Sequence, residues 1–211
     1  MEHKETLQRM HDGRLYYCDS EKLMEEQAAC LEILYDFNAT RPSEGKKRRE
    51  ILEKLFAEVG ENCYIEPPLH ANWGRHTHLG NNVYANFNLT LVDDTHIYIG
   101  DNTLIGPNCV LATANHPVHP QLRALTAQYN LPISIGRNVW LGAGVIVVPG
   151  VSIGENSVIG AGSVVTKDIP ANSVAFGNPC RVRRTIDEKD FAFFNKGQAI
   201  DEAVLERLKR P

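Results

Sequence analysis

The sequence predicts a parallel β-helix, a solenoid of short strands, with charged helical segments at both ends. Residues 135–176 divide into seven consecutive six-residue blocks, each opening with Ile, Leu, Val or Ala and often followed by Gly. Residues 61–180 hold only 11 of the 48 Lys, Arg, Asp and Glu residues of the 211-residue chain. The flanking segments instead carry apolar residues at helical spacing. Three regions follow: 1–60, 61–186 and 187–211.

Residues 1–60 are expected to form a small helical unit packed on the first turn of the solenoid. Residues 21–37 carry large side chains near helical spacing, and residues 46–59 carry a second apolar stripe. The basic run at 46–49 is interpreted as a solvent-exposed helix start, with anion binding as the alternative.

Residues 61–186 form the predicted β-helix. A period of six fits a short strand and a corner, three per turn, so each leading aliphatic should stack on its equivalent 18 residues later. Gly and Asn are expected at corners that need a positive φ. The phase recurs at 79–96 and 99–110, with a two-residue slip at Ile97 and Tyr98. The alternative, a β-sandwich with Gly-rich turns, is disfavoured by the strict period.

Residues 117–134 interrupt the repeat and are predicted to form an excursion at one corner, a place where insertions often carry function. Charge returns in residues 187–211, which are predicted to be a tail with a short amphipathic helix. Its aromatic run at 191–194 is expected to pack back on the body.

Composition argues against several function classes. A net charge of −4 disfavours nucleic-acid binding, and no run approaches the roughly 18 apolar residues of a membrane span. The N-terminus lacks the apolar region of a secretory signal. Five cysteines without a CxxC motif argue against a disulfide framework or a zinc knuckle. We therefore expect a cytoplasmic protein with reduced thiols that binds neither nucleic acid nor membrane.

Six of the eight histidines lie between residues 70 and 119, which suggests a metal site as one interpretation. His76 and His78, joined by His96, His116 or His119, would supply imidazole ligands from stacked turns, as a metal-dependent hydratase requires. Residues i and i+2 of a strand also share a face, so His76 and His78 would equally suit solvent. We predict no metal and keep the hydratase as an alternative.

The second interpretation makes His116 a general base. His116 lies where the repeat gives way to the excursion, and Pro117 restricts it to an extended backbone. Imidazole, with a pKa of about 6.5 in model peptides, suits removal of a hydroxyl proton near neutral pH.

Four stretches resemble the hexapeptide-repeat sugar acetyltransferases, whose branches are named for galactosides, maltose and nodulation. They are VGENCYIEPP (59–68), NNVYANFNLTLVDD (81–94), NHPVHPQLR (115–123) and GAGSVVTKDIPANSVAFGNPCRV (160–182). The likeness covers roughly residues 7–190, and the segments FNATRPSE and LVDD resemble the galactoside branch. The resemblance implies a left-handed solenoid, a hand that spacing alone does not specify.

The resemblance also implies a reaction. Acetyl-CoA is expected as co-substrate, without a required metal, and acetyl transfer is direct, to a sugar hydroxyl such as the 6-hydroxyl of a galactoside. His116 would be the base. A maltose- or glucose-type acceptor is the alternative within the family, and a non-catalytic scaffold is the alternative outside it.

Matched position by position, the resemblance implies two sets of binding residues. The acceptor would be bound by Asp19, Asn72, Asn86 and Asp94, and coenzyme A by Ala143 (through its backbone N–H), Ala161, Thr166, Lys167, Arg181 and Arg184. Asn72 and Ala143 stand where the galactoside branch has Ser, and Gln128 lies where it has Met. These departures bear on the identity of the acceptor rather than on the chemistry. Tyr84 and Trp140 would either line the site or stack on the outer face.

The resemblance further implies a homotrimer with active sites between subunits. An apolar side of the solenoid, with Val145, Ile146, Val148 and Phe176, would supply the contact surface.

Overall fold

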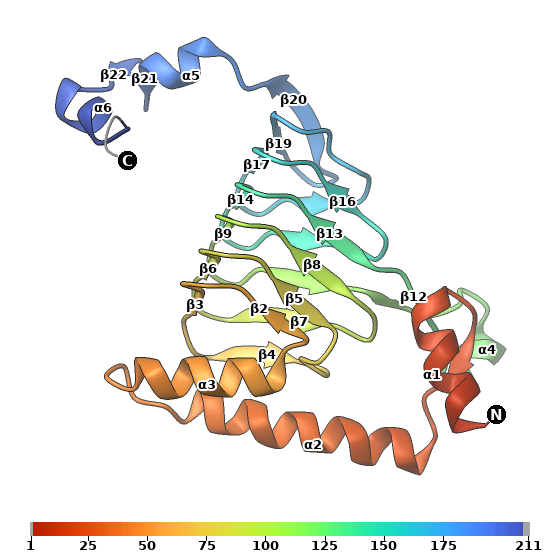
Figure 1. Ribbon diagram of the computed structural model, residues 1–211. Helices are drawn as coiled ribbons and strands as arrows, with labels where there is room; N and C mark the ends of the chain where they lie inside the picture. Colours follow the sequence, from red (N-terminus) through yellow and green to blue (C-terminus); the bar gives the residue numbers. More distant parts are fainter. Residues whose placement is uncertain (1, 209–211) are drawn as a thin grey trace.

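The computed structural model describes residues 2–208 and confirms a parallel β-helix (Figure 1). Three parallel sheets form its sides, and the chain runs from face 1 to face 2 to face 3 in every turn. Face 1 holds β2 (Glu58–Val59), β5 (Thr77–Leu79), β8 (Ile97–Ile99), β13 (Ile133–Ile135) and β16 (Ser152–Ile153). Face 2 holds β3 (Tyr64–Ile65), β6 (Tyr84–Ala85), β9 (Leu104–Ile105), β14 (Trp140–Leu141), β17 (Val158–Ile159) and β19 (Ser173–Phe176), and β20 (Arg181–Thr185) pairs antiparallel to β19. Face 3 holds β4 (Leu69–Ala71), β7 (Leu89–Val92), β10 (Val110–Ala112), β15 (Ile146–Val147) and β18 (Val164–Val165).

The register explains the slip in the repeat. After the excursion equivalent residues are 18 apart, as predicted, for example Trp140 opposite Val158, but in the last turn they are 16 apart, as for Val158 opposite Val174. In the earlier turns they are 20 apart, as for Tyr64 opposite Tyr84. The additional residues lie in the connection from face 3 to face 1, so this corner is wider in the early turns.

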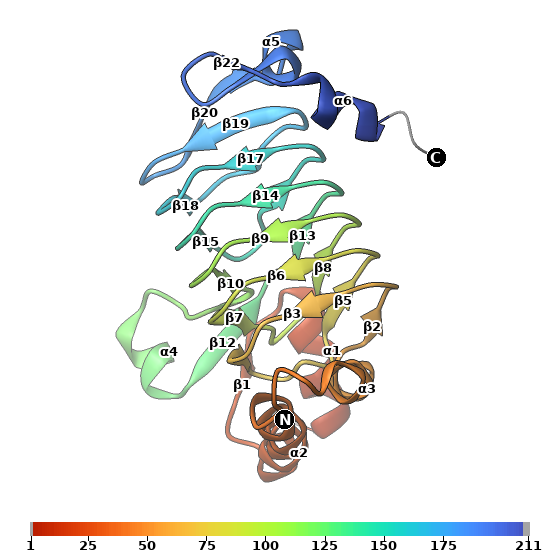
Figure 2. The ribbon, with the colours of Figure 1, turned by 90° about the vertical axis from the view of Figure 1, so that its left-hand side faces the viewer.

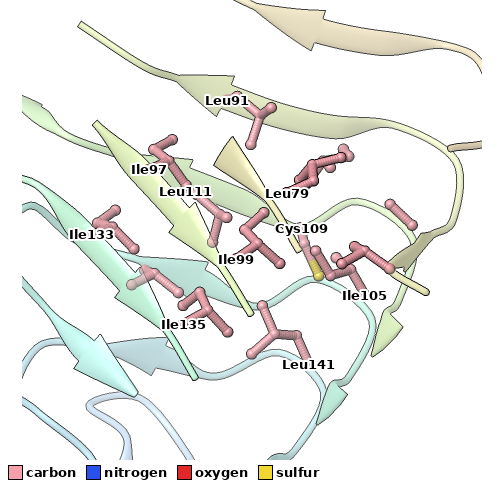
Figure 3. Packing of buried hydrophobic residues seen from close by; sticks show 14 of the residues in the cluster. Leu79, Leu91, Ile97, Ile99, Ile105, Cys109, Leu111, Ile133, Ile135 and Leu141 are labelled. Carbon is pink, nitrogen blue, oxygen red and sulfur yellow. The ribbon is translucent and has the colours of Figure 1, made fainter. Parts of the chain in front are cut away.

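The leading aliphatic side chains fill the interior, turn upon turn (Figure 3). Ile99 and Ile135 of face 1 meet Leu141 of face 2 there, and each is less than 5% exposed. Burial of each such side chain stabilises the fold by about 1.5–3 kcal/mol. Val145, expected on the apolar outer side, is fully buried because it precedes β15 at an inward position. Ile146 and Phe176 are exposed, and Val148 is half-buried.

Each turn has three corners, which we name by their position. The asparagine corner joins face 1 to face 2 (60–63, 80–83, 100–103, 136–139, 154–157), the narrow corner joins face 2 to face 3 (86–88, 106–109, 142–145, 160–163), and the wide corner joins face 3 to face 1 (72–76, 93–96, 113–132, 148–151, 166–168).

The excursion belongs to the wide corner and projects from the solenoid (Figure 2). It contains β11 (Ala114–Asn115), α4 (Pro120–Ala124) and β12 (Ala127–Asn130), and the chain returns to face 1 at Ile133. It therefore begins earlier than the predicted 117–134, because β11 leaves the solenoid to pair with β12.

The N-terminal residues form three helices and a strand. The helix predicted at 21–37 is α2 (Glu21–Asn38), which lies with α3 (Gly45–Leu55) across the base of the solenoid (Figure 1). The helix expected to reach residue 59 ends at Leu55, because Glu58 and Val59 pair with β5 as the first strand of face 1. Two further elements were not predicted: α1 (His3–Asp12), which packs on β12, and β1 (Tyr16–Tyr17), which pairs with β12.

Part of the basic run is structural rather than solvent-exposed. Lys46 and Lys47 are exposed, but Arg48 is buried between α3 and face 2. Its Nε donates to Thr40 Oγ1 (2.8 Å) and its Nη1 to Tyr64 Oη (2.8 Å).

The tail contains α5 (Glu188–Ala192), β21 (Phe193–Phe194), β22 (Gln198–Ala199) and α6 (Glu202–Leu208), so the predicted helix is present; residues 209–211 lie outside the described residues. The expectation that 191–194 packs on the body is wrong, because Phe191, Phe193 and Phe194 are all at least half exposed and the tail extends beyond the solenoid (Figure 1). Among the described residues, no helix is long and apolar enough to cross a membrane.

Candidate active site

Three of the predicted acceptor and base residues belong to the wide corner. Asn72, Asp94 and His116 come from successive turns of this corner. Asn72 Nδ2 donates to Asp94 Oδ2 (2.8 Å), and both residues line a cavity of about 200 Å³. The cavity lies between the corner, α1, β1, α2 and β12; its other lining residues are Met10, Tyr16, Cys18, Leu23, Met24, Gln27, Trp73 and Gln128. Asp19 is exposed and follows the cavity-lining Cys18.

His116 is held in a defined orientation. Its Nδ1 lies 2.8 Å from the carbonyl oxygen of Ala127 in β12, and its backbone N–H donates to Asn115 Oδ1 (3.0 Å). A carbonyl only accepts, so Nδ1 must carry the proton, and in the neutral ring Nε2 is then the free acceptor. The side chain is exposed, so Nε2 is accessible to a substrate hydroxyl.

The two adjacent carboxylates have different roles. Asp93 is fully buried and accepts hydrogen bonds from the backbone N–H of Trp73 (2.8 Å) and the hydroxyl of Thr77 (3.1 Å). It thereby links its own turn of the solenoid to the preceding one. Its burial raises the pKa of the Asp93 carboxyl to about 6. Asp94 lines the cavity, so only the second carboxylate is placed to accept a hydroxyl.

A second group of predicted residues lies on the narrow corner. Asn86, Ala143 and Ala161 come from three turns there, and face 3 separates them from the wide corner. Asn86 Oδ1 accepts from the backbone N–H of Phe87 (2.7 Å). The backbone N–H of Ala143 has no hydrogen-bond partner among the residues that the structure describes, and Ala143 is exposed. A single chain therefore does not bring these three residues to His116.

The predicted phosphate-binding cations lie at the upper end of the solenoid. Thr166 and Lys167 are exposed on the wide corner, and Arg181 lies exposed on β20. Arg184 of the same strand forms a two-bond ion pair with Asp190 (2.5 and 2.6 Å). Lys167 and Arg181 are thus the more available cations of this set.

Tyr84 and Trp140 point outward from face 2. Tyr84 stacks on Tyr64 with ring centroids 6.4 Å apart, and Trp140 is 53% exposed. In the single chain, Tyr84 therefore stacks on the outer face of the solenoid, which is one of the two roles that the sequence left open for it.

Two clusters lie beside the cavity, and the sequence predicts only part of the first, the imidazoles of His76, His78 and His96 on stacked turns. In one, His11 of α1 lies among His76 and His96 (centroids 4.8 Å from each), and His78 Nε2 lies 3.0 Å from His96 Nδ1. In the described part of the chain, no group of three or more His, Cys, Asp or Glu side chains is arranged to hold a metal ion. The other cluster joins Tyr16, Gln128 and Asn130 through buried hydrogen bonds. No local pattern predicts that His11 joins these imidazoles or that Tyr16 joins Gln128 and Asn130, because α1 and β1 are more than 60 residues from their partners.

Comparison with known proteins decides the family. Residues 9–60 match the maltose acetyltransferase hexapeptide capping motif, residues 96–114 the hexapeptide repeat of succinyl-transferase, and residues 132–167 the bacterial transferase hexapeptide (six repeats). Galactoside O-acetyltransferase of Lactococcus lactis subsp. lactis (strain IL1403) is 52% identical over 198 residues, which are 93% of this chain and 96% of that protein. The chain belongs to the galactoside O-acetyltransferase family.

Solved structures of similar proteins agree with the fold. A galactoside acetyltransferase in complex with coenzyme A is 46% identical, covers 96% of this chain and 100% of its own, and superposes with a TM-score of 0.90. A maltose O-acetyltransferase from Clostridium difficile 630 is 45% identical over 87% of this chain and 98% of its own, with a TM-score of 0.85. The resemblance identified in the sequence is confirmed, and a member of the galactoside O-acetyltransferase family is an acyltransferase.

Proposed function

We propose that the protein transfers an acetyl group from acetyl-CoA directly to a sugar hydroxyl, the 6-hydroxyl of a galactoside, with His116 as general base. The observation that carries this is the orientation of His116, whose Nδ1–H is committed to Ala127 while Nε2 stays free. The 46% identical structure in complex with coenzyme A supports the co-substrate.

The reaction follows from these groups. Nε2 of His116 takes the hydroxyl proton as the oxygen attacks the thioester carbon, which gives a tetrahedral oxyanion. The N–H of Ala143, which has no partner within residues 2–208, is suited to stabilise that oxyanion, and a backbone donor is unaffected by the Ser-to-Ala departure. Collapse of the intermediate breaks the carbon–sulfur bond, and the departing thiolate recovers the proton from the His116 imidazolium.

Binding of the two substrates is assigned to different parts of the solenoid. Asp94 has its Oδ1 available for a sugar hydroxyl, since Asn72 engages Oδ2, and Asp19 and Asn86 complete the proposed acceptor set. Lys167 and Arg181, with Thr166, Ala161 and Arg184, are proposed to contact coenzyme A, whose phosphates need cations in a charge-poor solenoid.

We also propose a homotrimer with each site between two subunits. The support is the division of the assigned residues between two corners, which a neighbouring copy would bring together. A column of exposed apolar side chains on face 2 supports the contact: Tyr64, Leu104, Trp140 and Phe176 are each at least 39% exposed. We assign the protein to the cytoplasm, where acetyl-CoA is available and where its five free cysteines would stay reduced.

His116→Ala tests the base. We expect turnover to fall by about a hundredfold or more, while coenzyme A binding measured by calorimetry stays unchanged. His119→Ala removes another exposed imidazole of the excursion and serves as the matched control, with turnover near that of the unmodified protein. Unchanged turnover in His116→Ala would refute the mechanism.

An acceptor screen tests the substrate. Galactosides, glucosides and maltose are offered with acetyl-CoA, release of free thiol is followed, and the acetylated position is located. A preference for galactosides with 6-O-acetyl product supports the proposal. A preference for maltose or glucose would favour the maltose-type alternative, which is supported by the 45% identity to a maltose O-acetyltransferase of known structure.

A further inference from the structure

Asn130 is a buried amide that joins four segments around the proposed site. Its side chain is 1% exposed. Nδ2 lies within hydrogen-bonding distance of the carbonyl oxygens of Met10 (3.0 Å) and Asp94 (3.3 Å) and of Tyr16 Oη (2.9 Å). Oδ1 accepts from Gln128 Nε2 (2.9 Å). One side chain thus links α1, β1 and β12 to the corner that carries Asp94.

Burial makes this geometry restrictive. An amide removed from water is unfavourable unless its donors and acceptor find partners, so displacement of any of these segments breaks bonds that water cannot replace. The Met10 carbonyl is in the last turn of α1, where carbonyls lack a partner within the helix. Asn130 supplies that partner, so the end of α1 is tied to the same point.

The network reaches His116 through β12. Ala127, whose carbonyl accepts from His116 Nδ1, begins this strand and Asn130 ends it. β12 lies between β1 (Tyr16 opposite Gln128) and β11 (Ala114 opposite Asn130). Gln128 and Asn130 are two residues apart and share the buried side of the strand. Sliding or rotation of β12 would therefore move the Ala127 carbonyl away from His116.

We propose that Asn130 is a positioning residue for acetyl transfer. It fixes β12, which orients the base His116, to the backbone of Asp94, which binds the acceptor, so that the two groups keep a constant separation. The proposal rests on the proposed function, which assigns those roles to His116 and Asp94.

Gln128 supports this network rather than contacting the acceptor. Its amide nitrogen donates to Tyr16 Oη (2.6 Å) and to Asn130, and its Oε1 accepts from Cys18 Sγ (3.3 Å). Burial raises the pKa of the Cys18 thiol to about 11, so this thiol remains protonated and able to donate. Both amide hydrogens of Gln128 are used, which leaves none for a sugar hydroxyl.

The test substitutes Asn130→Ala and reads two properties. By ¹⁵N NMR of the imidazole, His116 in the unmodified protein should carry its proton on Nδ1, and the variant should shift toward the Nε2–H tautomer that free histidine favours. The kcat for acetyl transfer should fall by roughly tenfold to a hundredfold, because displacement of a catalytic group by about 1 Å is enough for such a loss, while KM for acetyl-CoA stays constant. Asn38→Ala is the matched control, since Asn38 also clamps a helix to the solenoid through two hydrogen bonds to Leu69.

A purely structural role for Asn130 would leave the His116 tautomer unchanged, and that result overturns the proposal whatever happens to kcat. A tautomer shift with an unaltered kcat also overturns it, whereas the proposed function fails separately if His116→Ala keeps full turnover. Should Asn130→Ala not fold, Asn130→Asp preserves the acceptor for Gln128, removes the donors to Asp94 and Met10, and carries the same expectation.

Discussion

Single asparagines with positive φ determine how the chain turns at the asparagine corner. Asn138, Asn156 and Asn172 have φ of 54°, 61° and 55°, and their side-chain amides form a ladder from turn to turn. The expectation of positive φ at corner asparagines is confirmed. The glycines after the leading aliphatics have another cause: a Cβ at Gly142 would lie 2.6 Å from the backbone nitrogen of Ala161, so there the stacking of turns excludes a side chain.

Asn156 allows the two contributions of a corner asparagine to be separated. Asn156→Gly removes both ladder bonds (3.1 and 2.8 Å) but tolerates the positive φ, whereas Asn156→Ala loses the same bonds and is also strained. We expect the alanine variant to have a free energy of unfolding about 1–2 kcal/mol below that of the glycine variant, measured by urea denaturation. Equal values for the two variants would mean that the backbone conformation costs nothing at this position.

Among the elements, α1 is attached to the solenoid through imidazoles. His11 contacts His76 and His96, and its Nδ1 lies 2.9 Å from Thr95 Oγ1. The charged neighbours are Arg75, Asp12 of α1, Glu58 beside His78, and Glu26 of α2, which pairs with Arg75. Burial is the main cause that lowers the pKa of His11, His76 and His96, and the pKa of His76 falls to about 3.

These shifts predict that acid destabilises the protein. Because the folded pKa of His76 is about 3 against an ordinary 6.5, the unfolded chain binds more protons between these values, so stability is complete above pH 6.5 and falls as pH decreases. Asp93 acts oppositely: its pKa is raised from 3.8 to about 6, so its contribution is complete below pH 3.8 and is lost as pH rises through 6. Because three histidines oppose one carboxyl, the free energy of unfolding decreases overall on acidification.

The His11→Asn variant tests this prediction. Its free energy of unfolding should depend less steeply on pH below 6.5 than that of the unmodified protein, whereas His119→Asn should leave the dependence unchanged. Parallel curves for all three proteins would contradict this.

How far the sequence predicts each element depends on periodicity. The six-residue period predicts the strands and the interior, and the break in that period marks the excursion at which His116 lies. Asn72 and Asp94 are predicted only through the family resemblance, because nothing in the period itself distinguishes them. The sequence predicts the end of a helix where β2 forms, because Val59 fits both the helical and the strand pattern and only its pairing with Leu79 distinguishes them. Sequence periodicity does not predict contacts such as that of Tyr16 with Asn130, because they join segments 114 residues apart.

For the whole molecule, the decisive feature is that the assigned residues occupy two corners of one solenoid. His116 and Asp94 lie on the wide corner, and Asn86 and Ala143 lie on the narrow corner across face 3. In a ring of identical subunits each interface is heterologous, so the wide corner of one copy would meet the narrow corner of the next. Each site would then need His116 from one subunit and Asn86 from another.

Mixing subunits of two variants tests whether each active site is formed by two subunits. His116→Ala and Asn86→Ala, each expected to be nearly inactive alone, are unfolded together in equal amounts and refolded. If sites lie between subunits, random assembly gives about a quarter of the interfaces an intact His116 and an intact Asn86, so about a quarter of the unmodified activity should return. If each site lay within one chain, every site would carry one of the two defects, and mixing would restore nothing. Refolding each variant alone controls for recovery, and a monomeric mass for the unmodified protein in solution would remove the shared site outright.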